Sequence, residues 1–187
     1  MRFVKTPLAD AFLVELDRLE DGRGFFARSF CGREFEQAGL NPAVVQCNVS
    51  RNRHGGTLRG MHYQVSPFEE AKLVRVTSGA NFDVIVDLRP SSPTFTQWYG
   101  QELTGESHTA LYVPEGFAHG FLTLADNTEV FYQMSNVYSP EYSRGVRYND
   151  PVIGIDWPSP IKLISPKDEA YPDFDAADPE LKTLSRR

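Results

Sequence analysis

The densest group of residues that could do chemistry lies between Gln46 and Gln64. It holds three arginines and two histidines, in a chain whose formal net charge is −6. Planar guanidinium groups suit phosphate oxygens, and the paired glycines Gly55 and Gly56 mark a turn that would deliver the following strand to a site. The segment therefore indicates a site for a small anionic ligand, with a solvated surface stretch as the alternative interpretation.

Two histidines, His62 in this segment and His119 beyond it, stand at the spacings of known sequence motifs. His62 follows Gly56 at the spacing of the first half-motif of a cupin barrel, and His119 ends a Pro-x-Gly-x-x-His pattern that resembles the second half-motif. Arg59 and His62 differ by an odd number of positions, so they would face opposite sides of a regular strand. A bulge at Gly60 would bring both side chains to one face.

The first half-motif also bears on metal binding. Metal-binding cupins supply a His-x-His pair there, whereas the second position in this chain is Gln64. His62 and His119 alone fall one or two ligands short of a usual zinc or transition-metal site. We therefore expect no metal, and a metal-dependent cupin dioxygenase or isomerase is the third-ranked interpretation.

Short β-rich runs, separated by Gly, Pro, Asn and Asp, must position these residues. One helix is predicted over residues 31–39, where helix formers precede a stop at Gly39. The rest of the pattern is typical of an all-β sandwich or barrel rather than of alternating strands and helices. The predicted strands cover residues 11–16, 44–50, 72–79, 81–89, 109–116 and 129–138.

The run over residues 81–89 shows how alternation assigns faces. It places Val84 and Val86 on one face and Asp83 and Asp87 on the other. Because a carboxylate on a strand is usually solvated, we expect Asp83 to face solvent. If that face lines a cavity instead, its acids would orient a histidine or bind a ligand.

Length and composition limit the class of protein. The chain has 187 residues, with 19 Lys and Arg against 25 Asp and Glu, and this acidic balance argues against a general nucleic-acid binder. No apolar run approaches the roughly 20 residues of a membrane span, and acids interrupt the N-terminal apolar stretch where a secretory signal needs continuity. We expect one cytoplasmic domain over residues 1–187, whose Pro-rich C-terminal part wraps over the barrel and frays from about Asp175.

Five segments together resemble the dTDP-4-dehydrorhamnose 3,5-epimerase family. They read GTLRGMHYQ, EEAKLVRVTSG, DVIVDLRPSSPTF, YVPEGFAHGF and VFYQMS, at residues 56–64, 69–79, 83–95, 112–121 and 130–135. The resemblance implies an all-β, cupin-like double-stranded β-helix (jelly roll) with a few short helices, a homodimer and no cofactor. It also implies a nucleotide-linked 4-keto-6-deoxyhexose as substrate, inverted at C3 and/or C5 in deoxysugar or polysaccharide biosynthesis.

Inverting a carbon next to a ketone needs a base, a cation or donor for the enolate oxygen, and an acid on the opposite face. The resemblance assigns His62 as the base, Lys72 as the cation, Tyr132 as the acid and Asp168 as the carboxylate that orients the histidine. Taken singly, these residues also fit ordinary roles as a structural histidine, a solvated lysine, a packed tyrosine and a loop acid.

Further positions match the substrate contacts of the family. The negative charge of a diphosphate accounts for the arginines. The rings of Phe26 and Tyr138 could stack on a nucleotide base or simply pack within the protein. These positions are Arg23, Phe26, Gln46, Asn48, Arg59, Lys72, His119, Tyr138 and Lys167.

The chain departs from the family at two positions, where Arg28 and Ser143 stand in place of the common Glu. Either Arg28 adds a phosphate contact, or the nearby Glu141 replaces a missing carboxylate. These departures leave three alternatives open. The first is a changed nucleotide (CDP or GDP instead of dTDP) or a changed sugar, the second is inversion at one carbon only, and the third is a nucleotide-sugar-binding protein that retains the pocket without the chemistry.

Overall fold

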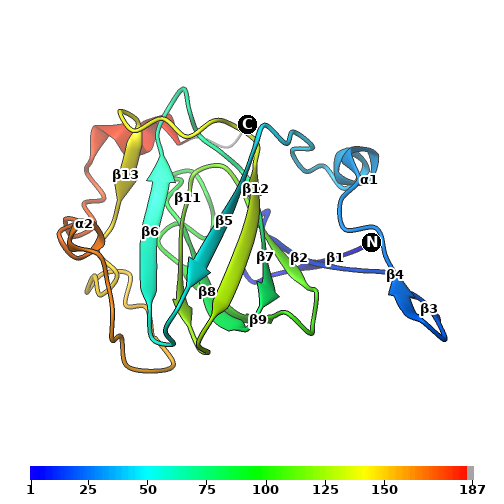
Figure 1. Cartoon of the computed structure of the whole chain (residues 1–187). Helices are drawn as coiled ribbons and strands as arrows, with labels where there is room; N and C mark the ends of the chain where they lie inside the picture. The colour runs from blue at the N-terminus through cyan, green and yellow to red at the C-terminus, as the bar shows by residue number, and fades with distance from the viewer. Residues whose placement is uncertain (185–187) are drawn as a thin grey trace.

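Two antiparallel β-sheets face each other in the computed structural model, which describes residues 1–184 (Figure 1). The six-stranded sheet has the order β1 (Arg2–Lys5), β2 (Phe12–Glu15), β10 (Ala110–Val113), β7 (Lys72–Ser78), β12 (Thr128–Met134) and β5 (Gln46–Asn52). The five-stranded sheet has the order β13 (Ser143–Gly145), β6 (Leu58–Gln64), β11 (Phe117–Thr123), β8 (Ala80–Asp87) and β9 (Trp98–Thr104). A separate hairpin joins β3 (Leu19–Asp21) and β4 (Gly24–Phe26).

This architecture confirms the predicted all-β class. Each of the six predicted runs overlaps a strand, and the predicted helix is α1 (Gly32–Gln37), which ends before Gly39 at a φ of 74°. The other helices are α2 (Pro166–Glu169) and the 3₁₀ helix η1 (Pro179–Thr183). Within residues 1–184, no helix is long and apolar enough to cross a membrane.

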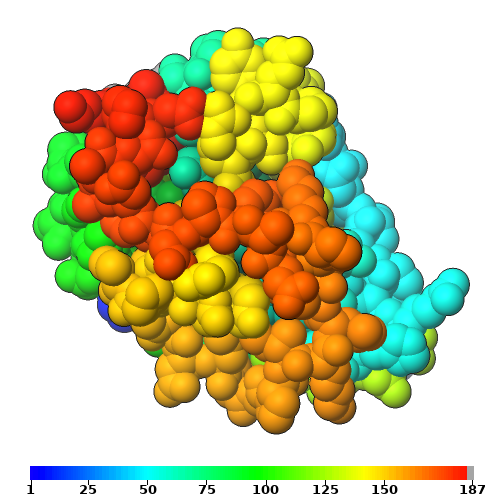
Figure 2. All heavy atoms as spheres, turned by 90° about the vertical axis from the view of Figure 1, so that its left-hand side faces the viewer, coloured from blue at the N-terminus to red at the C-terminus, as the bar shows by residue number. Residues whose placement is uncertain are grey.

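The hydrophobic core has three parts, one between the sheets and one on each outer face. Between the sheets, Val74 and Val130 meet Ile85 and Phe121. Helix α1 covers the outer face of the six-stranded sheet, where Phe35 is buried. The C-terminal segment lies over the outer face of the five-stranded sheet, and in Figure 2 it fills much of the view in orange and red.

The position of the C-terminal segment bears on two expectations: the frayed tail and the assignment of strand faces by alternation. The segment after 175 does not fray within the described residues, because η1 forms there and the side chains of Leu181 and Leu184 are buried against the five-stranded sheet. The end of the predicted tail, residues 185–187, lies outside the described residues. Because this sheet is covered on both faces, every residue of β11 is buried. Alternation therefore cannot separate a solvent face from a core face here.

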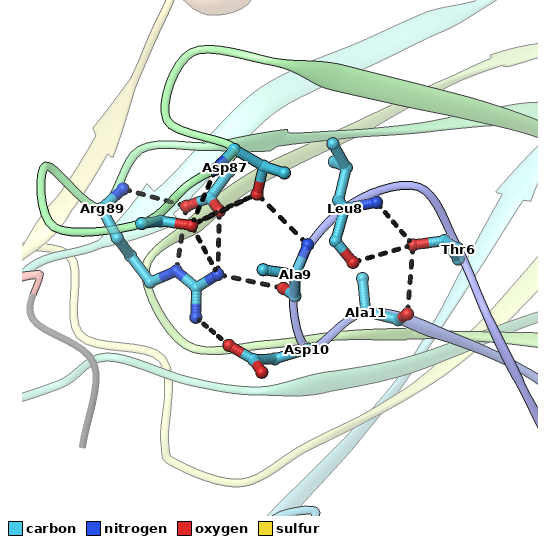
Figure 3. Close-up of polar contacts among 9 residues, drawn as sticks. Thr6, Leu8, Ala9, Asp10, Ala11, Asp87 and Arg89 are labelled. Atoms are coloured by element: carbon cyan, nitrogen blue, oxygen red, sulfur yellow. Dashed lines mark hydrogen bonds and ion pairs between the residues drawn. The ribbon is translucent and has the colours of Figure 1, made fainter.

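A buried ion-pair network fastens the N-terminal segment to the barrel (Figure 3). The guanidinium of Arg89 donates from Nε and Nη2 to the Asp87 carboxylate at 2.9 and 2.8 Å, from Nη1 to Asp10 at 2.9 Å, and from Nη2 to the Ala9 carbonyl at 3.0 Å. Burial acts to raise the pKa of Asp87, but the hydrogen bonds outweigh it and hold that pKa below its ordinary value of 3.8. The network thus fixes the turn between β1 and β2 as an ionised, fully bonded unit.

Replacing Arg89 by Met should lower the free energy of unfolding by about 3 kcal/mol, because the Asp87 charge would remain buried without its partner. The matched control is Arg2→Met, which removes the exposed Arg2–Glu15 pair and should cost less than about 1 kcal/mol. Urea unfolding at pH 7 measures both changes. Since the folded pKa of Asp87 is lowered, its contribution is complete above about pH 4 and is lost as the pH falls through the lower folded value. Equal losses in the two variants would contradict this role.

Candidate active site

A bulge in β6 brings Arg59 and His62 to the same side of the five-stranded sheet. His62 pairs with His119, and Arg59 pairs with Phe121. The advance of three residues from Arg59 to His62 on β6 therefore lies opposite an advance of two residues on β11. Gly60 lies inside the bulge with a φ of 134°, and a Cβ there would approach the Gly120 Cα to 2.5 Å. Only glycine fits this close crossing of the two strands. The predicted bulge is confirmed.

The imidazole of His62 is held by a carboxylate from the C-terminal segment. His62 Nε2 and Asp168 Oδ1 are 2.8 Å apart, and the Gly60 N–H donates to Asp168 Oδ2 at 3.3 Å. Asp168 lies in the short helix α2, and its own N–H donates to the Ser165 hydroxyl at the start of that helix. The side chain of Asp168 is buried, whereas that of His62 is 39% exposed. The histidine is therefore anchored on one side and open on the other.

The protonation of this pair follows from its hydrogen bonds. Burial acts to raise the pKa of Asp168, but the His62 side chain and the Gly60 N–H outweigh it and leave that pKa below its ordinary value of 3.8. An ionised carboxylate can only accept, so His62 Nε2 must carry the proton of the bond between them. In the neutral ring, Nδ1 is then the basic nitrogen.

Two adjoining hollows open between the sheets, and three side chains line both of them. The first hollow has a volume of about 300 Å³ and the second about 330 Å³. The shared residues are His62, Lys72 and Tyr132. His62 stands on the five-stranded sheet, while Lys72 and Tyr132 stand on neighbouring strands of the six-stranded sheet. A flat group in this space would have an imidazole on one sheet and a phenol on the other.

Lys72 is not the solvated strand-end lysine of the alternative interpretation. Its ammonium lies 3.0 Å from Glu70 Oε1, and the Lys72 side chain is 9% exposed. Glu70 is absent from the residues predicted for the site. Its signal in the sequence is the spacing of two from Lys72, which places both on one side of an extended segment.

The first hollow extends along β5 toward the loop after β12. Gln46, Asn48, Tyr138 and Lys167 line it, as does Ser143. The Gln46 carboxamide donates to Asn48 Oδ1 at 3.1 Å and accepts from the Tyr138 N–H at 3.0 Å. Four predicted substrate-contact residues thus line this hollow: three continue the wall from Tyr132, and Lys167 comes from α2, which lies against β6.

The second hollow contains two further predicted residues, Arg59 and His119. Arg59 Nε donates to Asn52 Oδ1 at 2.8 Å, and His119 Nε2 lies 2.8 Å from Asp83 Oδ1. Asp83 is completely buried, so the expectation that it faces solvent is wrong. It lies on the inner face of a sheet whose outer face the C-terminal segment covers, and it orients a histidine, as the second interpretation of this strand had it.

Two predicted contacts, Arg23 and Phe26, line neither hollow. Both lie on the β3–β4 hairpin, which projects from the body of the protein in Figure 1. Their side chains are exposed, and Arg23 pairs with Asp21 of the same turn at 2.6 Å. Within one chain, the hairpin is thus separate from the other predicted site residues.

The two positions that depart from the family have different surroundings. Arg28 Nη1 donates to Glu34 at 2.7 Å and lines neither hollow, whereas Ser143 lines the first. Glu141 lines neither hollow. Across residues 1–184, no three His, Cys, Asp or Glu side chains are grouped as ligands for a metal ion.

Comparisons with known proteins converge on one family. A family model described as dTDP-4-dehydrorhamnose 3,5-epimerase matches residues 5–176. The protein of that name from Shigella flexneri is 44% identical over 169 residues, which are 90% of this chain and 93% of the relative.

Solved structures agree over the whole fold. The crystal structure of dTDP-4-dehydrorhamnose 3,5-epimerase from Elizabethkingia anophelis matches with a TM-score of 0.91 and 41% identity, covering 93% of this chain and 96% of that one. The dTDP-6-deoxy-D-glucose-3,5-epimerase of Legionella pneumophila, solved with dTDP-4-keto-L-rhamnose, matches with a TM-score of 0.90 and 39% identity, covering 100% and 98%. The chain therefore belongs to the dTDP-4-dehydrorhamnose 3,5-epimerase family and has its cupin-like fold.

Proposed function

We propose that this protein is a cofactor-independent epimerase of a nucleotide-diphospho-4-keto-6-deoxyhexose, in deoxysugar biosynthesis. The observation that carries the proposal is the arrangement of three side chains: His62 on one sheet, with Tyr132 and Lys72 opposite it on the other. The family's dTDP-linked substrate is the first candidate. The reaction is inversion at C3, C5 or both, next to the 4-keto group.

The first step removes the proton of the carbon next to the ketone. His62 Nδ1 takes this proton, and the C–H electron pair forms the double bond of an enolate while the carbonyl pair moves to oxygen. The ammonium of Lys72 stabilises the enolate oxygen. The ionised Asp168 stabilises the imidazolium that His62 becomes, through the 2.8 Å hydrogen bond.

The second step returns a proton from the other side. The Tyr132 hydroxyl donates its proton to the enolate carbon, the enolate electrons form the new C–H bond, and the ketone is restored. A phenol holds its proton at neutral pH and is therefore available as the acid. Because base and acid stand on facing sheets, the carbon leaves with the opposite configuration, and both groups are reset by proton exchange with water.

Cations and amides along the hollows fit the rest of such a substrate. Arg59 and Lys167 provide positive charge for the diphosphate, and His119 is held in place by Asp83. Tyr138 offers an exposed ring on which a base can stack, next to the carboxamide of Gln46. We place this reaction in the cytoplasm, where charged nucleotide sugars are retained, and assign residues 1–187 to one domain.

We infer that the protein acts as a homodimer in which the β3–β4 hairpin reaches the partner's site. The hairpin exposes the apolar side chains of Leu19, Phe25 and Phe26, which a single chain leaves uncovered. It also carries Arg23, an expected diphosphate contact that lies apart from its own chain's hollows. A two-fold arrangement would give each site one hairpin and would bury these side chains.

Solvent deuterium exchange tests the proposed reaction. In D₂O, the wild-type protein should incorporate deuterium at C3 or C5 of a dTDP-, CDP- or GDP-linked 4-keto-6-deoxyhexose, as followed by NMR. His62→Ala should lose both exchange and inversion by at least about 100-fold, because it lacks the base. Tyr132→Phe should retain exchange but form little epimer, because the proton then returns from the face it left.

Each outcome of that experiment separates one alternative. Exchange at a single carbon identifies a one-carbon epimerase. Binding of all three substrates without exchange at either carbon would instead identify a nucleotide-sugar-binding protein and would refute the proposed reaction.

Asp168→Asn should lower kcat on the order of 10³-fold with little change in KM. The amide cannot compensate the imidazolium formed on His62, and it no longer dictates which ring nitrogen carries the proton. Steady-state kinetics at pH 7, with circular dichroism to confirm folding, measures this effect. The matched control is Asp173→Asn, an exposed acid of the same C-terminal segment, paired with Arg147. Asp168→Asn kinetics equal to those of the control would count against the assignment.

Mixing two variants tests the exchanged hairpin. His62→Ala lacks the base, and Arg23→Ala lacks the hairpin cation. Hybrid dimers formed after subunit exchange contain one intact site, so an equimolar mixture should recover about a quarter of wild-type activity. Light scattering should give the mass of a dimer at micromolar concentration. A monomer, or a mixture no more active than the mean of its components, would rule out the shared site.

A further inference from the structure

A single carboxylate lines the two hollows, among the residues that the structure describes. This carboxylate is Glu70, in the first hollow. The other ionic side chains of the two linings are the cations Arg51, Arg59, Lys72 and Lys167, besides histidines and tyrosines. A carboxylate in a cavity built for a diphosphate weakens binding by like-charge repulsion, unless it does something else.

Glu70 is engaged on both of its oxygens. Oε1 lies 3.0 Å from the ammonium of Lys72, and Oε2 accepts from Gln64 Nε2 at 2.9 Å. The Glu70 side chain is only 4% exposed. Leaving one member of such a buried pair alone is costly, so the two charges hold each other in place.

Gln64, the residue in place of a metal ligand, ties this pair to the wall of the first hollow. Its Oε1 accepts from the Ser139 N–H at 2.6 Å, while its Nε2 lies 3.1 Å from the Val137 carbonyl. These hydrogen bonds hold the backbone in place on both sides of Tyr138. Nε2 also lies 2.7 Å from the Phe68 carbonyl, so its two hydrogens serve three acceptors, one of which is Glu70.

We propose that Glu70, braced by Gln64, is a positioning residue that holds the Lys72 ammonium against the enolate oxygen. The inference rests on the proposed function. Without Glu70, the flexible lysine would turn toward the negatively charged diphosphate instead of the ketone. The pair adds no net charge to the cavity, and Lys72 therefore acts as a fixed hydrogen-bond donor to the ketone oxygen.

Glu70 has no substitute within the linings of the two hollows. The other titratable and charged side chains that share the hollows with Lys72 are His62, Arg59 and Tyr63 on β6, His119 on β11, Tyr132 on β12, Arg51 on β5, Lys167 on α2, and Tyr138. None of them is a carboxylate. Among these residues, Glu70 alone can hold the ammonium by an opposite charge 3.0 Å away.

The test is the rate of deuterium exchange in Glu70→Gln, separated into kcat and KM. The glutamine keeps the size and an acceptor oxygen but removes the charge. We expect kcat at pH 7 to fall roughly tenfold with little change in KM, because the ammonium is no longer held at the ketone oxygen. Glu69→Gln is the matched control, since it makes the same charge change one residue earlier, outside both linings, and should follow the wild type.

Glu70→Asp keeps the charge but withdraws it by one methylene. It should lower kcat severalfold, less than Glu70→Gln does, because the shorter carboxylate still attracts the ammonium. This variant also keeps the proposal testable if Glu70→Gln fails to fold by circular dichroism. A Glu70→Gln variant with wild-type kcat, or a Glu70→Asp variant with wild-type kcat, overturns the inference alone. Absence of exchange in the wild type overturns the proposed function and this inference with it.

Discussion

The hydrogen bond between His62 and Asp168 is the contact on which the account of this site depends. It joins β6, in the middle of the barrel, to α2, near the C-terminal end of the chain, across 106 residues of sequence. The ionised carboxylate fixes the imidazole, decides which ring nitrogen is basic and, in the proposed reaction, compensates the charge that the ring gains. The C-terminal segment therefore buries the outer face of the five-stranded sheet and also supplies the carboxylate that anchors His62, the base of the proposed reaction.

In the proposed reaction, the positions of the base and the acid on two facing sheets determine the stereochemical outcome. The bulge at Gly60 places His62 and Arg59 on the inner face of one sheet, and strand pairing places Tyr132 and Lys72 on the inner face of the other. In the proposed reaction, a planar enolate between the sheets then meets a base and an acid on its two sides. The same cavity needs positive charge for a diphosphate while its lysine stays at the ketone, and we infer that the buried Glu70 meets that requirement.

Much of this site could be predicted from the sequence, because its motifs fix spacings that strand geometry converts into positions. His62, Lys72, Tyr132 and Asp168 were expected, and so was the bulge at Gly60. Asp83 was expected in solvent, because alternation along one strand cannot reveal that a distant segment covers the other face. The separation of Arg23 and Phe26 from the hollows depends on where a short hairpin projects, which residue types do not encode. Glu70 could not be predicted as a site residue, because an acid two residues from a lysine usually indicates a solvated surface.

The most direct test of the central claim is the tautomer of His62 in the free protein, read from the ¹⁵N and ¹H NMR shifts of its imidazole. His62→Asn identifies the signals by their disappearance. The account predicts a neutral ring protonated at Nε2, with an unprotonated Nδ1 open to the substrate. A ring protonated at Nδ1 would contradict it, because the nitrogen facing Asp168 would then lack the proton for their hydrogen bond and the substrate side would lack a base.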